Sequence, residues 1–337
     1  MKKRILDILL LWLAAAGAMA GEYQYQPGKG MLFSWTTDDH VGTYTTSGSR
    51  MYYSVTGDIT DRNAAMMSCG WALVSDARYY SYAPYSSYYL DTPVTELPIT
   101  YDGQTQAANG STSHLASFDY MAASAQTDDT GATFNYSHLG CILRLVLPVK
   151  KTATFKSVTL TVPASGESLF VAEATMDLTT LSTDAVKMSE TLVLTLDNIM
   201  VEEGSDLVAY FMMAPADFTG MTLHAALAKA DGTVDGIDIK GMKLLPGMIY
   251  NAGATDGNEG ASLSKTVRKS ETQQISAITC IAPDFGEETL TAVVTGIEKV
   301  KMQADSRNGI LTKGAKIYES ANGTIYALNG RKYLMKR

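Results

Sequence analysis

The sequence has little of what catalytic and metal sites usually require. Its 337 residues include only three cysteines, Cys69, Cys141 and Cys280, and no C-x-x-C pair. A cysteine zinc site and a dithiol redox site are therefore not indicated, and at most one disulfide can form. The four histidines are isolated, and neither an H-E-x-x-H, a G-x-S-x-G nor a phosphate-binding loop occurs. We expect a protein that is not an enzyme and that uses no metal and no cofactor.

Charge is also sparse, because only 18% of the residues are charged and the net charge is -8. This acidic balance argues against nucleic acid as a partner, since phosphate binding needs clustered lysine and arginine. The charge is unevenly distributed. Residues 21–254 carry 12 basic and 25 acidic side chains, whereas residues 255–337 carry 12 basic and 9 acidic ones. The change of sign near residue 255 marks a candidate boundary.

The first 20 residues have the pattern of a secretory signal peptide. Lys2, Lys3 and Arg4 precede an apolar run over residues 8–16, and the small-residue site Ala18-Met19-Ala20 follows it. This pattern predicts cleavage between Ala20 and Gly21 and export of the mature chain. The apolar run is too short to span a bilayer comfortably, and no lipobox cysteine follows it.

Most of the remaining chain predicts β-structure. Short alternating or β-branched runs occur at 51–55, 141–147, 157–162, 191–196 and 207–213, with turn signals between them such as Asp231-Gly232 and Pro246-Gly247. Helical periodicity is weak, apart from a short helix expected near residues 62–67. The spacing of strands and turns favours β-sandwiches over alternating strands and helices.

Composition divides the chain further. The polar break QTDDTG at 126–131 separates a predicted N-terminal β-sandwich domain, residues 21–126, from a predicted C-terminal β-sandwich domain, residues 131–254. Residues 255–273 are rich in Gly, Ser, Asn and charged residues and are predicted to be a linker. Residues 274–337 form a predicted β-rich C-terminal tail.

Two local patterns each have two interpretations. Six tyrosines lie within residues 79–89, and together with Trp35 the rings of Tyr82 and Tyr85 can form an aromatic surface that stacks on sugars. The same tyrosines can instead pack inside a sandwich around a proline-containing turn, which is the simpler interpretation. The run DGTVDGID at 231–238 resembles a calcium loop, but its twelfth position is Met242 instead of glutamate. Two successive β-turns explain it better.

Several motifs in this order resemble the fimbrillin family of Bacteroidetes, the subunits of type V pili. FSWTTDDHVGTY at 33–44 is similar to the family's W-x-x-G-D-x-I-G-V-Y opening, with Asp38 in place of the usual glycine. The tyrosine run with Ala83-Pro84-Tyr85 resembles Y-x-A-Y-x-P-Y. The remaining matches resemble P-x-x-Q, D-x-M-x-A, F-x-F-x-H and P-G-x-x-Y, and they lie at 97–106, 118–122, 134–139 and 245–250.

The resemblance covers about residues 31–252 and carries implications for fold and function. It implies two tandem transthyretin-like β-sandwich domains and a location at the cell surface, in a fimbrium or on the outer membrane. It further implies that other fimbrial subunits are partners through β-strand exchange, with the chain as a structural subunit or as a tip adhesin. His138 and Tyr250 would then be packing residues. The alternative is a secreted or surface glycan-binding module, whose partners are host or bacterial surface glycans or proteins.

Two departures from the family pattern stand out. Only residues 21–32 separate the predicted cleavage site from the tryptophan motif, whereas fimbrillins have a first strand of several tens of residues there. In the resembling family this first strand fills a groove of the sandwich. In this chain the groove could therefore stand open from the start. Residues 323–336 resemble the sorting tail of type IX secretion, although a plain β-hairpin with an Asn329-Gly330 turn explains them equally well.

Overall fold

The computed structural model shows an all-β protein, as the sequence predicts. Strands dominate, and the part of the chain that is described contains no α-helix, only short 3-10 turns such as η2 (Ser113–Ser117). The structure describes residues 21–45, 50–68, 73–87, 89, 92–128, 131–163, 166–253 and 277–296, together with three short strands between 317 and 333. The predicted signal peptide, Cys69 and the predicted linker lie outside these residues.

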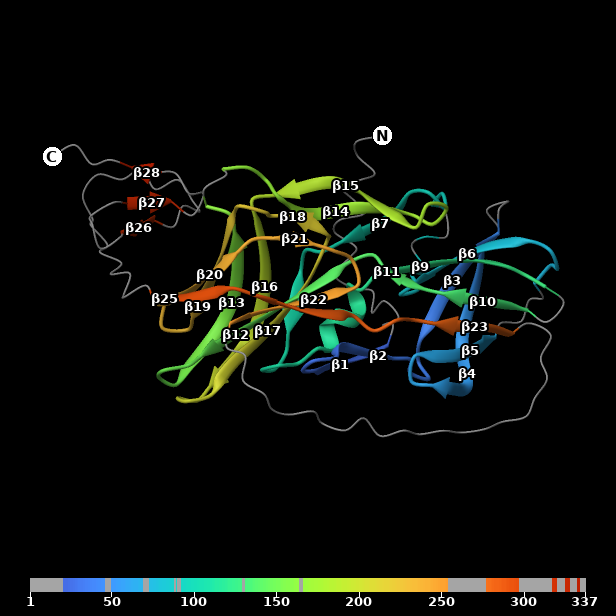
Figure 1. The fold of residues 1–337 in the computed structure, drawn as a ribbon, viewed down its shortest axis with the longest axis horizontal. Coiled ribbons are helices and arrows are strands. Elements are labelled where there is room, and N and C mark those ends of the chain that lie inside the picture. Colours follow the sequence, from blue (N-terminus) through green and yellow to red (C-terminus); the bar gives the residue numbers. More distant parts are fainter. Residues whose placement is uncertain are drawn as a thin grey trace.

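An eight-stranded sheet forms one half of the molecule (Figure 1). In spatial order its strands are β10 (Ala132–Asn135), β23 (Ala277–Ile281), β5 (Ala64–Ser68), β4 (Arg50–Asp61), β3 (His40–Thr45), β6 (Arg78–Ala83), β9 (Met121–Gln126) and β11 (Ser137–His138). A separate antiparallel pair, β1 (Glu22–Gln26) and β2 (Gly30–Ser34), precedes it in the chain.

Two larger sheets form the other half. The four-stranded sheet has the order β17 (Asp206–Met213), β12 (Cys141–Pro148), β22 (Met248–Gly253) and β24 (Gly286–Leu290). The six-stranded sheet has the order β25 (Ala292–Gly296), β20 (Val234–Lys240), β19 (Thr222–Lys229), β13 (Ala153–Thr161), β16 (Thr191–Val201) and β8 (Gln104–Gln106). Smaller sheets join β15 (Ser182–Ser189), β14 (Phe170–Asp177) and β7 (Leu97–Thr100), and β18 (Ala216–Asp217) with β21 (Lys243–Leu244).

The strand patterns of the sequence account for these layers. In β16, the buried side chains are apolar and lie at every second position over most of the strand. Strand β12 is apolar almost throughout because it lies inside its sheet, between β17 and β22. The buried side chains of both halves form one continuous cluster.

The prediction of a helix near residues 62–67 is wrong, because most of this segment lies in strand β5. Its alanines and methionines favour a helix in isolation. In the fold, Ala65 and Met67 are fully buried while Met66 points outward, which is the two-residue period of a strand. Pairing with β4 and β23 on either side overrides the local preference.

The two predicted sandwich ranges are linked by residues 97–109. Strands β7 and β8 pair with β14 and β16 of the other half. Beyond them, the buried Gln104 amide accepts the Met212 N–H (2.8 Å) and donates to the Met212 carbonyl (2.6 Å). Gln106 and Asn109 bind other backbone groups of β17 in the same way. These side-chain amides satisfy the outer edge of β17, which none of the described strands covers.

The predicted C-terminal tail divides into two parts. In Figure 1 its orange and red-orange strands run through the body of the molecule, from β23 in the eight-stranded sheet to β25 in the six-stranded sheet. The last described strands, β26 (Ile317–Glu319), β27 (Ile325–Ala327) and β28 (Lys332–Tyr333), pair only with one another in a three-stranded sheet. Residues 277–296 are therefore part of both halves and not an appendage.

Candidate functional site

The most distinctive site is the groove that holds residues 277–296. Strand β23 lies between β10, with which it is parallel, and β5, with which it is antiparallel. Cys280 pairs with Phe134 on one side and with Ala65 on the other. Ile278 and Cys280 are both 0% exposed. A strand from beyond residue 253 thus fills an interior position of a sheet that is otherwise built from residues 40–138.

After β23 the chain reaches a junction formed by Pro283, Asp284 and Phe285. The Asp284 carboxylate accepts two hydrogen bonds from the Arg62 guanidinium and a third from the Phe33 N–H (2.8 Å). Arg62 also donates to the Phe33 carbonyl, at 2.5 Å. The bond to Asp284 raises the pKa of Arg62 above its usual value. This two-pronged ion pair is specific for a carboxylate at this position.

Phe285 anchors the junction to β2. Its backbone exchanges two hydrogen bonds with Met31, at 2.9 and 3.2 Å. Next to this contact Gly30 has φ +95, and a Cβ there would lie 2.0 Å from the Phe285 carbonyl oxygen. Only glycine permits so close an approach in this conformation. The Phe285 ring is fully buried and stacks on His138 with ring centroids 3.8 Å apart.

A buried ion pair lies beneath the junction. His138 Nδ1 lies 2.7 Å from Asp119 Oδ2, and Nε2 lies 2.8 Å from the Pro283 carbonyl oxygen. Both neighbours accept hydrogen bonds, so the doubly protonated imidazolium satisfies both. Burial alone lowers the pKa of His138, but the Asp119 charge, its hydrogen bond and the Pro283 carbonyl together raise it. The Tyr23 hydroxyl also donates to Asp119 Oδ2, at 2.7 Å.

Strand β24 continues from the junction along β22. It pairs in parallel with β22 and thus forms the edge of the four-stranded sheet. The Glu287 carboxylate accepts hydrogen bonds from the Tyr25 hydroxyl (2.5 Å), the Gly28 N–H (2.6 Å) and the Asn251 amide. Burial and the bond to Glu287 raise the pKa of Tyr25 to about 12. Strand β25 then adds to the free side of β20.

The predicted aromatic surface is only partly on the surface. Trp35 and Tyr82 are each 3% exposed, and the Trp35 ring lies 4.8 Å from that of Phe33. These two rings therefore have no face free for a sugar. Tyr85 is half-buried, and its ring lies 4.7 Å from that of Tyr52, which is 40% exposed. The aromatic-platform hypothesis thus rests on Tyr85 and on a neighbour that the sequence did not indicate.

Of the two residues at the predicted cleavage site, Ala20 lies outside the described residues and Gly21 is the first of them. The Gly21 N–H donates to Asp39 Oδ1, at 2.8 Å. The resemblance implied packing roles for His138 and Tyr250. Tyr250 is fully buried and its hydroxyl accepts the Leu245 N–H, whereas His138 belongs to the buried ion pair described above.

The other patterns of the sequence form no metal site in the part that is described. Asp231 accepts the N–H and hydroxyl of Thr233 in the turn between β19 and β20, as the turn interpretation predicts. Cys141 and Cys280 are buried free thiols. No cluster of potential metal ligands occurs among the described residues. Nor does any helix there have the length and apolar character needed to cross a membrane.

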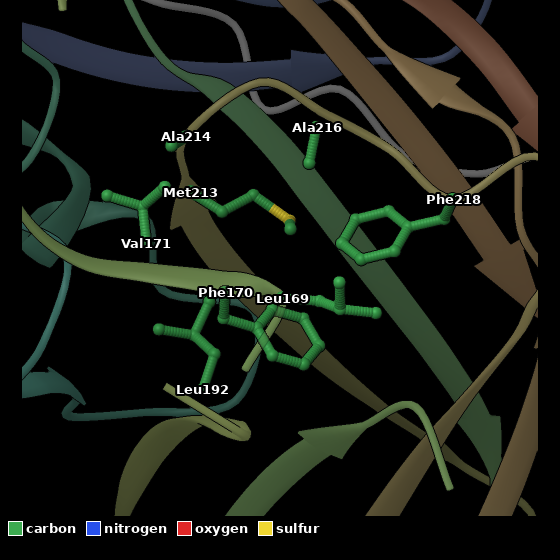
Figure 2. Close-up of a pocket in the computed structure, with 8 residues that line it drawn as sticks. All are labelled: Leu169, Phe170, Val171, Leu192, Met213, Ala214, Ala216 and Phe218. Carbon is green, nitrogen blue, oxygen red and sulfur yellow. The ribbon is translucent and has the colours of Figure 1, made fainter. Parts of the chain in front are cut away.

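An apolar recess lies in the other half of the molecule (Figure 2). It is shallow and has no room for a water molecule. Its walls come from residues next to or within β14, β16, β17 and β18, and the lining residues are Leu169, Phe170, Val171, Leu192, Met213, Ala214, Ala216 and Phe218. These side chains supply no acid, base or nucleophile, so the recess adds no chemistry to the site.

Sequence reasoning missed the residues that hold the C-terminal segment. Arg62, Asp119, Asp284 and Glu287 are ordinary charged residues in the sequence. Asp119 lies in the segment that resembles D-x-M-x-A, but the motif alone does not indicate its partner. That partner, His138, binds a carbonyl 145 residues away. Only the three-dimensional fold brings these residues together.

Comparison with known proteins leaves the family unassigned. No family model matches the chain, and no curated protein matches it. Among solved structures, a candidate cell adhesion protein of Bacteroides ovatus is 15% identical, with 69% of this chain and 88% of that chain covered and a TM-score of 0.46. A candidate cell adhesion protein of Bacteroides thetaiotaomicron is 12% identical, with 68% and 88% covered and a TM-score of 0.38.

A third structure, a candidate cell adhesion protein of Parabacteroides distasonis, is 9% identical. It covers 83% of this chain and 96% of its own, with a TM-score of 0.32. With identities this low and TM-scores below 0.5, these likenesses do not assign the chain to a family. The fimbrillin resemblance therefore stays a prediction.

Proposed function

We propose that this chain is a non-enzymatic, fimbrillin-like subunit of a cell-surface fibre, and that its copies join by exchanging residues 277–296. The observation that carries the proposal is the interior position of β23. It completes the eight-stranded sheet between β10 and β5, yet it comes from beyond residue 253. The sequence resemblance over residues 31–252 and the predicted signal peptide support export and assembly at the cell surface.

The energetics of exchange follow from the site. A groove without its strand exposes the edges of β5 and β10, and such edges pair readily with a strand from another chain. The donated strand regains the same contacts in a neighbour, so exchange between identical copies costs little. Residues 254–276 join β22 to β23, and a chain of this length reaches up to about 80 Å when extended.

A chain whose strand is locked in its own groove should not assemble. Met66 on β5 is 38% exposed and pairs directly with the half-buried Thr279 on β23. Directly opposed positions of an antiparallel pair lie within disulfide reach. We expect cells that carry Met66→Cys with Thr279→Cys to export a folded protein but to display few fibres by negative staining. A reducing agent should restore the fibres.

The single variants Met66→Cys and Thr279→Cys are the matched controls, and both should form fibres at the wild-type level. A locked chain that forms as many fibres as the wild type would refute assembly through this strand.

Cells without the protein should show altered fibres or reduced adherence. Unchanged fibres and unchanged adherence would count against the proposed role as a whole.

The alternative function is glycan binding at the aromatic pair of the exposed Tyr52 and the half-buried Tyr85. The ring centroids of Tyr52 and Tyr85 lie 4.7 Å apart. The ring of Tyr52 also contacts that of His40, with the centroids again 4.7 Å apart. A glycan array with the mature chain tests this alternative. Binding that is lost in Tyr85→Ala and kept in Tyr85→Phe, which retains the ring, would favour it. Equal binding by wild type and Tyr85→Ala would exclude this platform.

A further inference from the structure

A buried carboxylate lies beside the predicted start of the mature chain. Asp39, between β2 and β3, is only 2% exposed. Its oxygens accept the N–H of Gly21 (2.8 Å) and the N–H of Thr36 (2.6 Å), which are both neutral donors. The other titratable groups that face it are His40 and Tyr23. Among the described residues, no lysine or arginine forms an ion pair with it.

This carboxylate lacks a full positive countercharge. Burial raises the pKa of Asp39 to about 6, and the hydrogen bonds from Gly21 and Thr36 oppose that effect only in part. A buried carboxylate usually has a charged partner or several strong donors, because removal from water is costly. Asp39 is therefore a site where an added cation would stabilise the fold.

The backbone nitrogen of Gly21 lies close enough to the Asp39 carboxylate to supply that cation. A Cβ on this residue would lie 2.1 Å from the Phe33 ring, so the position accepts only glycine without rearrangement. Hydrolysis of the Ala20–Gly21 peptide bond consumes one water and leaves a carboxylate on Ala20 and an amine on Gly21. The amine takes up a proton near neutral pH, since an α-amino group has a pKa of about 7.7–8.0.

We propose that cleavage after Ala20 converts the Gly21–Asp39 hydrogen bond into a buried ion pair between the new α-ammonium group and the Asp39 carboxylate. The precursor has only a neutral amide at this position. Removal of the leader thus stabilises the start of β1. This strand also contains Tyr23, whose hydroxyl donates a hydrogen bond to Asp119. The mature chain is more stable than the precursor. This proposal does not depend on strand exchange.

Thermal unfolding of two chains tests the ion pair. One chain begins at Gly21 with a free amine, and the other retains Ala20 as its first residue, so that Gly21 keeps an amide. At pH 7 the chain that begins at Gly21 should have the higher Tm, and Asp39→Asn should abolish the difference between the two. Equal Tm values of the two wild-type chains, or a difference that persists in Asp39→Asn, would overturn the proposal.

The amine itself gives a second measurement that does not require a destabilised variant. A pairing carboxylate raises the pKa of the amine, so the stabilisation is present while Asp39 is ionised and the amine is protonated, and it is lost as the pH rises through the raised value. We expect the acetylation rate of the Gly21 amine, followed by mass spectrometry, to report a pKa above the ordinary value of about 7.7–8.0. An ordinary pKa, or a mature N-terminus other than Gly21 in the exported protein, would contradict the proposal.

Discussion

A chain that ends at Gly253 is expected to lose cooperative unfolding and to aggregate, because it lacks β23, β24 and β25. Removal of these strands leaves three sheets with unfilled positions beside β5 and β10, beside β22 and beside β20. Unpaired strand edges of this kind associate with one another. Circular dichroism during heating and light scattering at 37 °C measure the two effects.

The size of the stability loss follows from how deeply the side chains of the missing strands are buried. Ile278 and Phe285 are fully buried and Leu290 nearly so. Each such side chain contributes about 1.5–3 kcal/mol, and the free energy of unfolding of a whole domain is only about 5–15 kcal/mol. The loss of these three side chains therefore removes a large share of the stability, before the lost backbone hydrogen bonds are considered.

A chain that ends at Gly296 is the matched control. It keeps all three strands and lacks only residues 297–337, whose described strands pair with one another. We expect it to unfold like the full chain. A synthetic peptide of residues 277–296 should restore the transition of the chain that ends at Gly253. Cooperative unfolding of that chain at the wild-type Tm without peptide would contradict the assigned role of the segment.

Asp119→Ala should destabilise the protein by about 3–5 kcal/mol, the range for removal of one partner from a buried ion pair. The substitution leaves His138 and the Tyr23 hydroxyl without their shared acceptor. Both side chains of the pair are fully buried, so water cannot replace the lost contacts. Urea unfolding at pH 7 measures the change. A loss below 1 kcal/mol would show that the pair contributes little.

The same pair should make stability depend on pH. The pKa of His138 is raised in the folded protein, so its contribution is complete below the unfolded value of about 6.5 and is lost as the pH rises through the raised value. We expect the free energy of unfolding of the wild type to fall between pH 7 and pH 9. This window lies above the pKa of Asp39, which is about 6.

Asp119→Asn is the control for this pH dependence, because asparagine keeps the shape of the side chain but not its charge. Without the carboxylate, buried His138 should stay neutral, and stability should vary less between pH 7 and pH 9. An equally steep decline in this variant would assign the pH dependence to other groups.

Much of the fold could be predicted from local sequence. The runs at 141–147, 191–196 and 207–213 lie within β12, β16 and β17, because buried strands keep either an apolar run or a period of two. The segment at 62–67 could not be predicted in this way. Alanine and methionine suit a helix, and only contacts with β4 and β23 make it a strand.

The site was less predictable than the strands. The sequence indicated a β-rich tail after residue 273, but strand pairing between residues more than 100 apart has no local signal. The Asp284–Arg62 pair and the contact between His138 and Pro283 are of this kind. The position of β23 between β10 and β5 likewise has no signal in the local sequence.

The most direct test of strand exchange mixes two chains that each carry one introduced cysteine in a Cys69→Ser background, with the buried Cys141 and Cys280 kept. One chain carries Met66→Cys on β5 and the other Thr279→Cys on β23, and these positions pair in the fold. Exchange between copies predicts a disulfide-linked heterodimer whose yield rises with protein concentration. Met66→Cys mixed with Val193→Cys, an exposed position on β16, is the control. A heterodimer yield no higher than this control would contradict the account.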